Sequence, residues 1–224
     1  MIQALYGSRE LAEQMHYLER KLAENLVHTR ANGGRLPNYD DTACGRDLLA
    51  AWESKGFGRS DIALQFSIDG AQLQPDQPSE AWVFIWVVHN LPPSMRYKKD
   101  FVIPGAIVPG PNKPGDLDSF LFPSLYHMAA LQCEGLQIYD TSINAIIPRS
   151  IPCVVFGTAD SLGNAAMLGM VGHGGKYGCR LYCEMPGRHH DGDSHYYPVM
   201  TRPHDYDILG CDHPDISADD LLAY

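Results

Sequence analysis

The sequence has no apolar run long enough to cross a membrane, which takes about twenty residues, so we expect no membrane-spanning helix. Its first residues, Met1 to Gly7, lack the basic and long apolar regions of a signal peptide. Cysteine is also sparse, because 6 residues among 224 are too few for a disulfide scaffold, and this favours reduced thiols or metal ligands. These absences predict an intracellular protein.

Positive charge is scarce as well. The chain has 17 Lys and Arg against 27 Asp and Glu, a formal charge of −10. This argues against a free-standing, non-specific nucleic-acid binder, whose affinity depends on basic contacts to phosphates. It does not exclude an enzyme of nucleic acids, whose carboxylates hold metal ions and whose basic surface can lie elsewhere on the polypeptide.

The chain nevertheless has what a folded core needs. Its apolar content is 45%, and 20% charged residues is low for a disordered chain. The length suits one domain or one and a half. We divide it into a helical lead-in over 1–60, a core over 61–175 and a Cys- and His-rich segment over 176–224.

The lead-in shows a helical pattern. Ser8 is a candidate N-cap of a helix that runs to about Arg30 and ends at Gly33-Gly34. Apolar residues recur three or four positions apart along it: Leu11, Met15, Leu18, Leu22 and Leu26. We favour an amphipathic helix packed on a core over a coiled-coil partner, because the repeat is short. A second helix is expected from Arg46 to Lys55.

The core begins with three strand-like runs, over 62–68, 82–88 and 101–108, which predict an antiparallel meander. A helix that starts at Asp116 or Asp118 and stops at Gly135 follows, then a fourth strand over 151–159 and a short helix over 165–170. This order predicts an α+β sheet covered by helices. It is also the order of the ribonuclease-H-like fold, in which the first and fourth strands lie side by side.

Two aspartates stand at the carboxyl ends of apolar runs. Asp69 closes the first expected strand and Asp160 closes the fourth. Carboxylates that a sheet brings together form the usual start of a Mg²⁺ or Mn²⁺ site for phosphoryl transfer. Each also has a simpler interpretation, because Asp69-Gly70 is a common turn dipeptide and Asp160 can cap the segment that follows it.

The C-terminal segment is rich in Cys and His. Cys179 and Cys183 have a spacing found in zinc pairs, and Cys211 with His213 could complete a structural site. Two alternatives stay open, namely that the other ligands lie outside this chain and that the two cysteines bind no metal. A polar loop explains His189, His190, Asp191 and Asp193 as well as a metal site does.

Several segments together carry a family resemblance. They are Ser67 to Gly70, Asn90 to Pro93, Ile107 to Gly115, Thr158 to Asp160 and Gly178 to Cys183, with Met1 to Tyr17, Ser194 to Pro198 and Gly210 to Ile216. In these the chain resembles the Tnp2-type transposases of CACTA (En/Spm) elements, most closely the fungal branch. The resemblance covers nearly the whole chain.

The resemblance implies a ribonuclease-H-like domain of the DDE/D class, which cuts and joins DNA with metal-bound carboxylates. It implies that Asp69 is the first catalytic acid, Asp160 the second, and Cys179 with Cys183 a zinc-holding pair. It further implies transposon-end DNA as partner, a nuclear location, and a homo-oligomer or further transposase portions as possible partners.

The third acid of that class is expected on a helix beyond a long insertion. Glu184 is too close to the cysteine pair, and Asp219 and Asp220 lie in a polar tail. We therefore expect part of a transposase, with its chemistry incomplete in these residues. The alternative is a non-catalytic, zinc-stabilised DNA-contacting or protein-interaction module. A stand-alone metal-dependent hydrolase would need its third ligand among Glu184, Asp191 and Asp193.

Overall fold

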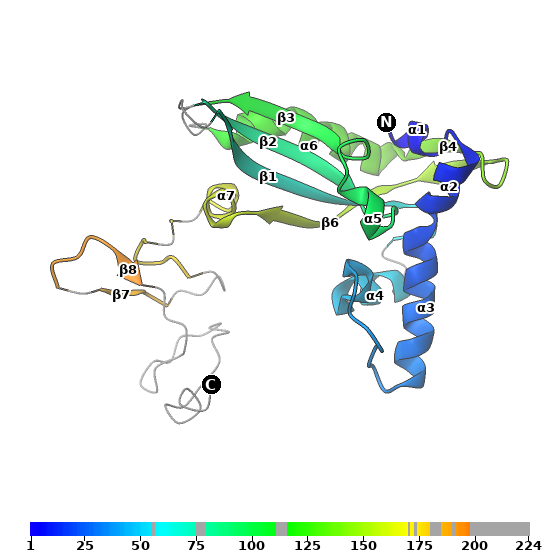
Figure 1. The fold of residues 1–224 in the computed structure, drawn as a ribbon, viewed down its shortest axis with the longest axis horizontal. Coiled ribbons are helices and arrows are strands. Elements are labelled where there is room, and N and C mark those ends of the chain that lie inside the picture. The colour runs from blue at the N-terminus through cyan, green and yellow to red at the C-terminus, as the bar shows by residue number, and fades with distance from the viewer. Residues whose placement is uncertain are drawn as a thin grey trace. The chain divides into compact units, whose positions relative to one another are not determined.

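The chain divides into two units, Met1–Thr158 and Ala159–Tyr224 (Figure 1). A computed structural model describes residues 1–54, 57–74, 79–110, 116–169, 171–172, 174–179, 185–189 and 191–197. In this part of the chain no helix has both the length and the apolar character needed to span a membrane. The domain boundaries expected after residues 60 and 175 stay predictions.

The first unit opens with three helices, α1 (Ile2–Leu5), α2 (Arg9–Met15) and α3 (Tyr17–Ala31). Ser8 caps α2 as predicted, since its hydroxyl accepts from the Leu11 amide. The prediction of one continuous helix is wrong, because the chain leaves helical geometry at His16, where the imidazole Nε2 lies 2.7 Å from Asp140 Oδ2. The buried Asp140 carboxylate thus fixes the break between α2 and α3.

The lead-in has its own core, which is continuous with the sheet. Helix α4 (Arg46–Glu53) follows the 3₁₀ turn η1 (Thr42–Cys44), close to where the second helix was predicted. Buried apolar residues of α3, η1, α4 and the neighbouring loops cluster with one residue of the first strand, namely Leu18, Leu22, Leu36, Ala43, Cys44, Leu48, Leu49, Phe57 and Ala63. The apolar stripe of α3 therefore packs on the fold, as we favoured over a coiled coil.

The main sheet has the strand order β3-β2-β1-β6. Strands β1 (Ile62–Gln74), β2 (Ser79–Val88) and β3 (Ile103–Pro109) form the predicted antiparallel meander. Strand β6 (Pro152–Ala159) lies beside β1, as expected for the fourth strand. The Ile62 amide donates to the Ile151 carbonyl at 3.0 Å, and further along Gly157 lies against Phe66. Both strands advance together, so they run parallel and the sheet is mixed.

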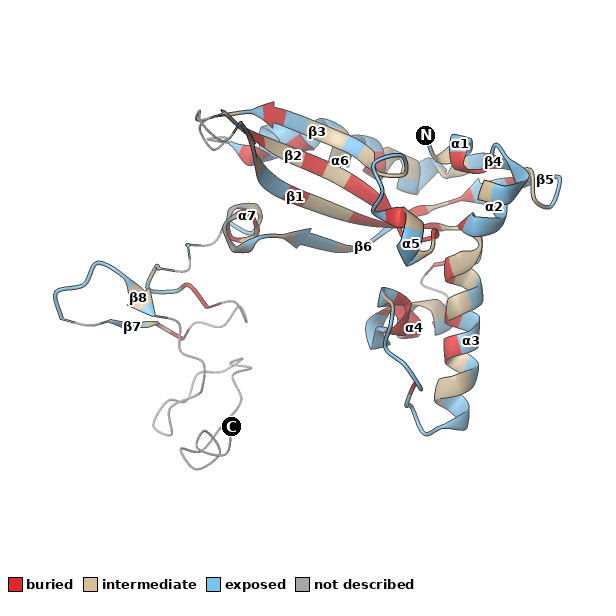
Figure 2. Cartoon of the chain, in the orientation of Figure 1, coloured by how far each residue is buried: buried red, intermediate tan, exposed pale blue. Residues whose placement is uncertain are grey.

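Side chains of a strand alternate between the two faces of its sheet, and buried residues lie along β1 and β2 (Figure 2). On one face the rings of Phe66, Phe84 and Trp86 pack edge to face with centroids 5.1–6.1 Å apart. Helix α6 (Leu117–Glu134) covers this face, where the Trp86 indole donates to Ser124 Oγ at 2.9 Å. The opposite face carries Ala63, which belongs to the lead-in cluster.

Helix α6 begins and ends as predicted. Asp116 caps it by accepting from the Ser119 amide, and Gly135 ends it at φ 79°, in the left-handed region. Between α6 and β6 the chain makes an unpredicted hairpin, β4 (Leu136–Asp140) and β5 (Ala145–Ser150). A short helix, α5 (Pro93–Arg96), was also missed.

The second unit contains α7 (Ser161–Met167) and the short strands β7 (Arg188–His189) and β8 (Tyr196–Tyr197). Helix α7 starts four residues before the short helix expected over 165–170. The overall architecture is α+β with a mixed sheet and flanking helices, which confirms the predicted class.

Candidate functional site

Asp69 lies within strand β1 and not at its end. It pairs with Val83 of β2, Gly70 pairs with Trp82, and β1 continues to Gln74. The prediction that the strand opens into a loop at Asp69 is therefore wrong, and so is the turn interpretation of Asp69-Gly70. A β-strand holds the Asp69 side chain, which is exposed and which alternation places on the face of Gln65.

Asp160 directly follows β6 and starts α7. Its Oδ1 accepts from the Gly163 amide at 2.5 Å, and its carbonyl accepts from the Asn164 amide. The N-cap interpretation of Asp160 is therefore confirmed. Capping uses one carboxylate oxygen and fixes the side chain at an exposed strand–helix junction.

The donor chemistry of both aspartates suits a hard divalent cation, since Mg²⁺ and Mn²⁺ prefer carboxylate oxygens. Asp69 belongs to the first unit and Asp160 to the second. Among the described residues no group of three or more His, Cys, Asp or Glu could hold a metal ion.

Most of the predicted zinc ligands lie outside the described residues, namely Cys183, Cys211 and His213. Cys179 is described and is 5% exposed. Glu184, His190, Asp219 and Asp220 also lie outside the described residues. The described part of the polar loop forms the β7–β8 hairpin, in which the His189 ring packs on Tyr196 and its Nε2 bonds to the Asp193 carbonyl oxygen.

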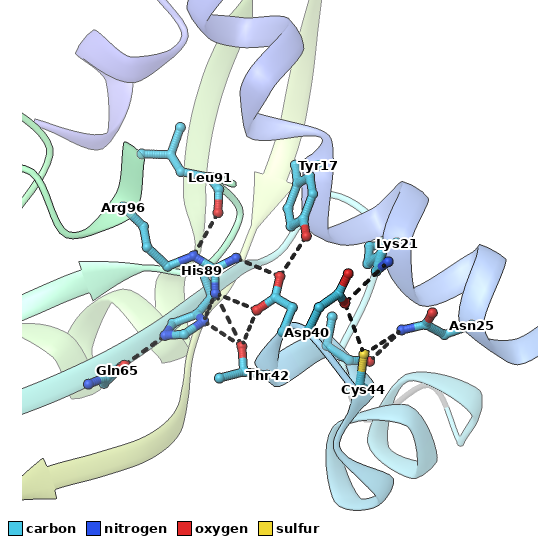
Figure 3. Close-up of polar contacts among 12 residues, drawn as sticks. Tyr17, Lys21, Asn25, Asp40, Thr42, Cys44, Gln65, His89, Leu91 and Arg96 are labelled. Atoms are coloured by element: carbon cyan, nitrogen blue, oxygen red, sulfur yellow. Dashed lines mark hydrogen bonds and ion pairs between the residues drawn. The ribbon is translucent and has the colours of Figure 1, made fainter. Parts of the chain in front are cut away.

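A polar cluster that was not predicted surrounds the buried Arg96 in the first unit (Figure 3). The guanidinium of Arg96 makes a two-pronged ion pair with Asp41, with both N–O distances at 2.9 Å. The two side chains are only 1% and 3% exposed. Arg96 Nε also donates to the Leu91 carbonyl, and the Tyr17 hydroxyl donates to Asp41 Oδ2 at 2.7 Å.

This environment shifts the acidity of Asp41. Burial acts to raise the pKa of its carboxyl, but hydrogen bonds from Arg96, Tyr17 and Thr42 outweigh burial and hold the pKa below its ordinary value. Burial also raises the pKa of the Tyr17 hydroxyl, which stays protonated and donates. The pair Asp41–Arg96 is therefore ionised wherever the protein is folded near neutral pH.

His89 continues the cluster towards the sheet. Its Nδ1 lies 2.7 Å from Arg96 Nη1 and its Nε2 lies 2.8 Å from Gln65 Oε1. Burial and the Arg96 charge lower the pKa of His89 to about 4, so the imidazole is neutral near pH 7. Because arginine only donates, Nδ1 accepts and Nε2 carries the proton, which it donates to Gln65.

A neighbouring asparagine ties the strand starts together. Asn90 Oδ1 accepts from the Ala63 amide at 2.9 Å, and its Nδ2 donates to the Asp61 carbonyl. The Asp61 carboxylate in turn accepts from the Ile151 amide at 2.7 Å. Asn90, which follows β2, therefore helps to align the beginnings of β1 and β6. From the sequence alone Asn90 is only a polar residue after a strand, so this role could not be predicted.

A cavity of about 780 Å³ opens beside this cluster. Its lining includes Thr42, Gln65, Tyr97, Phe156 and Thr158. Gln65 Nε2 donates to Thr158 Oγ1 at 2.8 Å, so the polar cluster reaches the end of β6 through this cavity wall.

Comparison with known proteins decides the family. The family model described as transposase family tnp2 matches residues 60–192, more than half of the chain. The chain belongs to this family. The matched stretch contains the whole four-stranded sheet, α6 and α7, whereas most of the lead-in lies before it. Comparison with curated proteins and with solved structures gives no match. Membership makes this tnp2 chain transposase-derived and implies that it binds DNA.

Proposed function

We propose that this tnp2 chain carries the first two acids of a CACTA-type DDE/D transposase, which cleaves and joins DNA strands with divalent metal ions on a ribonuclease-H-like sheet. The observation that carries the proposal is the neighbouring, parallel arrangement of β1, which contains Asp69, and β6, which Asp160 directly follows. A ribonuclease-H-like sheet has this order, with the fourth strand beside the first.

The strand register supports the pairing of these acids. Phe66 stands three residues before Asp69, and Gly157, which lies against Phe66, stands three residues before Asp160. Gln65 and Thr158 are hydrogen-bonded on the other face, and alternation along β1 assigns Asp69 to that same face. Asp160 stands two residues after Thr158, directly after the end of β6 at Ala159.

Asp69 and Asp160 would hold the metal through their carboxylate oxygens. Bound Mg²⁺ or Mn²⁺ supplies charge that activates the attacking oxygen and stabilises the leaving oxygen of the phosphodiester. Strand β1 orients the Asp69 side chain, and the Gly163 amide orients Asp160. The third acid would come from outside the described residues.

The test is Mn²⁺ binding to the full chain, followed by electron paramagnetic resonance. We expect Asp69→Asn and Asp160→Asn each to weaken Mn²⁺ binding at least tenfold. Asp100→Asn, at an exposed position outside the sheet, is the matched control and should bind as the wild type does. Equal affinities in all four proteins would refute the proposal.

We also propose a structural zinc site that includes Cys179 and Cys183, with Cys211 and His213, and a nuclear location. The support is the cysteine spacing and the burial of Cys179. Elemental analysis of the purified protein should give one zinc per chain, lost in Cys179→Ser. A chain that holds zinc but whose Mn²⁺ binding is independent of Asp69 would instead be the non-catalytic module.

A further inference from the structure

We propose that Gln65 and Thr158 are positioning residues for Asp160. A buried chain of hydrogen bonds, which runs from Asp41 through Arg96 to His89, fixes the orientation of the Gln65 amide. This amide holds Thr158 and thereby the end of β6. The inference rests on the proposed metal-binding role of Asp160. The polar cluster around Arg96 would then have a role in the proposed metal site, although it contains neither Asp69 nor Asp160.

Each hydrogen bond in this chain has a single possible direction. Arg96 can only donate, so His89 accepts at Nδ1 and donates from Nε2. Gln65 therefore presents its carbonyl oxygen to His89 and its NH₂ group to Thr158 Oγ1, 2.8 Å away. Rotating the amide by half a turn would set two donors against each other at His89, so the NH₂ group is locked towards β6.

Burial makes this arrangement stiff. His89 is 0% exposed, Arg96 1% and Gln65 7%, so water cannot take the place of a partner lost among these three, whereas Thr158 at the end of the chain of bonds is exposed. The His89 ring also packs edge to face on Phe156 of β6, with centroids 4.6 Å apart. Strand β6 therefore contacts the cluster through two side chains of one face, Phe156 and Thr158.

The hydrogen bond from Gln65 to Thr158, which we call the clamp, lies close to Asp160 in the sequence. Strand β6 stands at one edge of the sheet order and is anchored at its beginning, where Ile151 bonds to Asp61 and Ile62. Thr158 is the second anchor, and it stands two residues before Asp160. Without it, the end of β6 would keep its main-chain pairing but lose the side-chain contact that sets its position along β1.

The test compares Thr158→Val with Thr158→Ser and with Thr141→Val in the full chain. Valine keeps the shape of threonine but cannot accept from Gln65, whereas serine keeps the hydroxyl. Thr141 is the matched control, because its hydroxyl also makes one partly buried bond, to the Tyr6 carbonyl at 2.8 Å, in the first unit. Amide hydrogen exchange of β6 and Mn²⁺ affinity are measured for each protein.

We expect Thr158→Val to exchange its β6 amides at least tenfold faster while the β1–β2 amides keep their protection. Thr158→Ser and Thr141→Val should match the wild type in β6. Mn²⁺ affinity should fall at least fivefold in Thr158→Val alone. Wild-type protection of β6 in Thr158→Val would overturn the clamp, and unchanged Mn²⁺ affinity despite faster exchange would overturn its role for Asp160. If the wild type binds no Mn²⁺, the proposed function fails, and the exchange rates alone then decide whether the clamp exists.

Discussion

Replacing Arg96 by methionine tests the energetic weight of the buried ion pair. Methionine fills much of the same space but leaves the Asp41 carboxylate without its guanidinium, in a site where the two side chains are 3% and 1% exposed. It also removes the donors to His89 Nδ1 and to the Leu91 carbonyl. Tyr17 and Thr42 alone cannot balance the carboxylate charge.

The expected cost is about 3–5 kcal/mol, the range for removing one partner of a buried pair. Arg30→Met is the matched control, because Arg30 bonds to Glu53 at 2.7 Å but the two side chains are 68% and 54% exposed. An exposed pair contributes about 1 kcal/mol or less. The same substitution should therefore cost at least three times more at Arg96 than at Arg30.

Urea unfolding at pH 7 measures the difference. All three tryptophans, Trp52, Trp82 and Trp86, lie in the first unit, so their fluorescence reports its unfolding. With an m-value of about 2 kcal/mol/M, Arg96→Met should lower the midpoint by about 1.5–2.5 M and Arg30→Met by about 0.5 M or less. Equal midpoints in the two variants would refute the reasoning, because the pair would then contribute no more than a surface contact.

Three further predictions follow from the first unit. The pKa of His89 is about 4 in the folded protein and about 6.5 in the unfolded chain. Between these pH values the unfolded chain binds more protons than the folded protein. The free energy of unfolding should therefore fall by about 3 kcal/mol as the pH falls from about 6.5 to about 4. Urea midpoints across this range should show the slope, and His89→Gln should flatten it; an equal slope in both would contradict the assignment. Gly105→Ala should cost about 1–3 kcal/mol, because its Cβ would lie 2.6 Å from the Phe84 ring, and a thermal midpoint equal to that of the wild type would disprove the close contact. Ser124→Ala should lower stability by about 1 kcal/mol, since the buried Trp86 indole loses its acceptor, and a urea midpoint equal to that of the wild type would contradict this.

Secondary-structure elements whose sequence signals lie close together in the chain could be predicted. An apolar run predicts strand β2. An N-cap, a periodic apolar stripe and a terminating glycine, all within or next to the helix, predict α6. The β4–β5 hairpin could not be found this way, because it exposes the large apolar side chains Tyr139 and Ile146 and buries the charged Asp140, against the ordinary preference of each. Asp69 was placed at a strand end because Asp-Gly usually ends one, whereas pairing with β2 carries the strand to Gln74.

The polar cluster was missed for a different reason. Asp41 and Arg96 are 55 positions apart, and each stands next to turn residues where exposed charge is the ordinary expectation. Only the packing of the lead-in on the sheet buries them together. The signal that comes closest is Leu91-Pro92-Pro93, since a proline-started turn fixes where Arg96 can reach.

The ion pair between Asp41 and Arg96 also bears on which part of the chain folds as one piece. The stretch shared by the family begins at residue 60, yet Arg96 within it is neutralised by a carboxylate that lies before it. A polypeptide started at residue 60 would leave Arg96 without its counter-ion and without the lead-in that covers it, and would expose Ala63 of the apolar cluster to water. The cooperative folding unit is thus larger than the stretch that the family model matches, because it includes the lead-in residues that neutralise and cover Arg96.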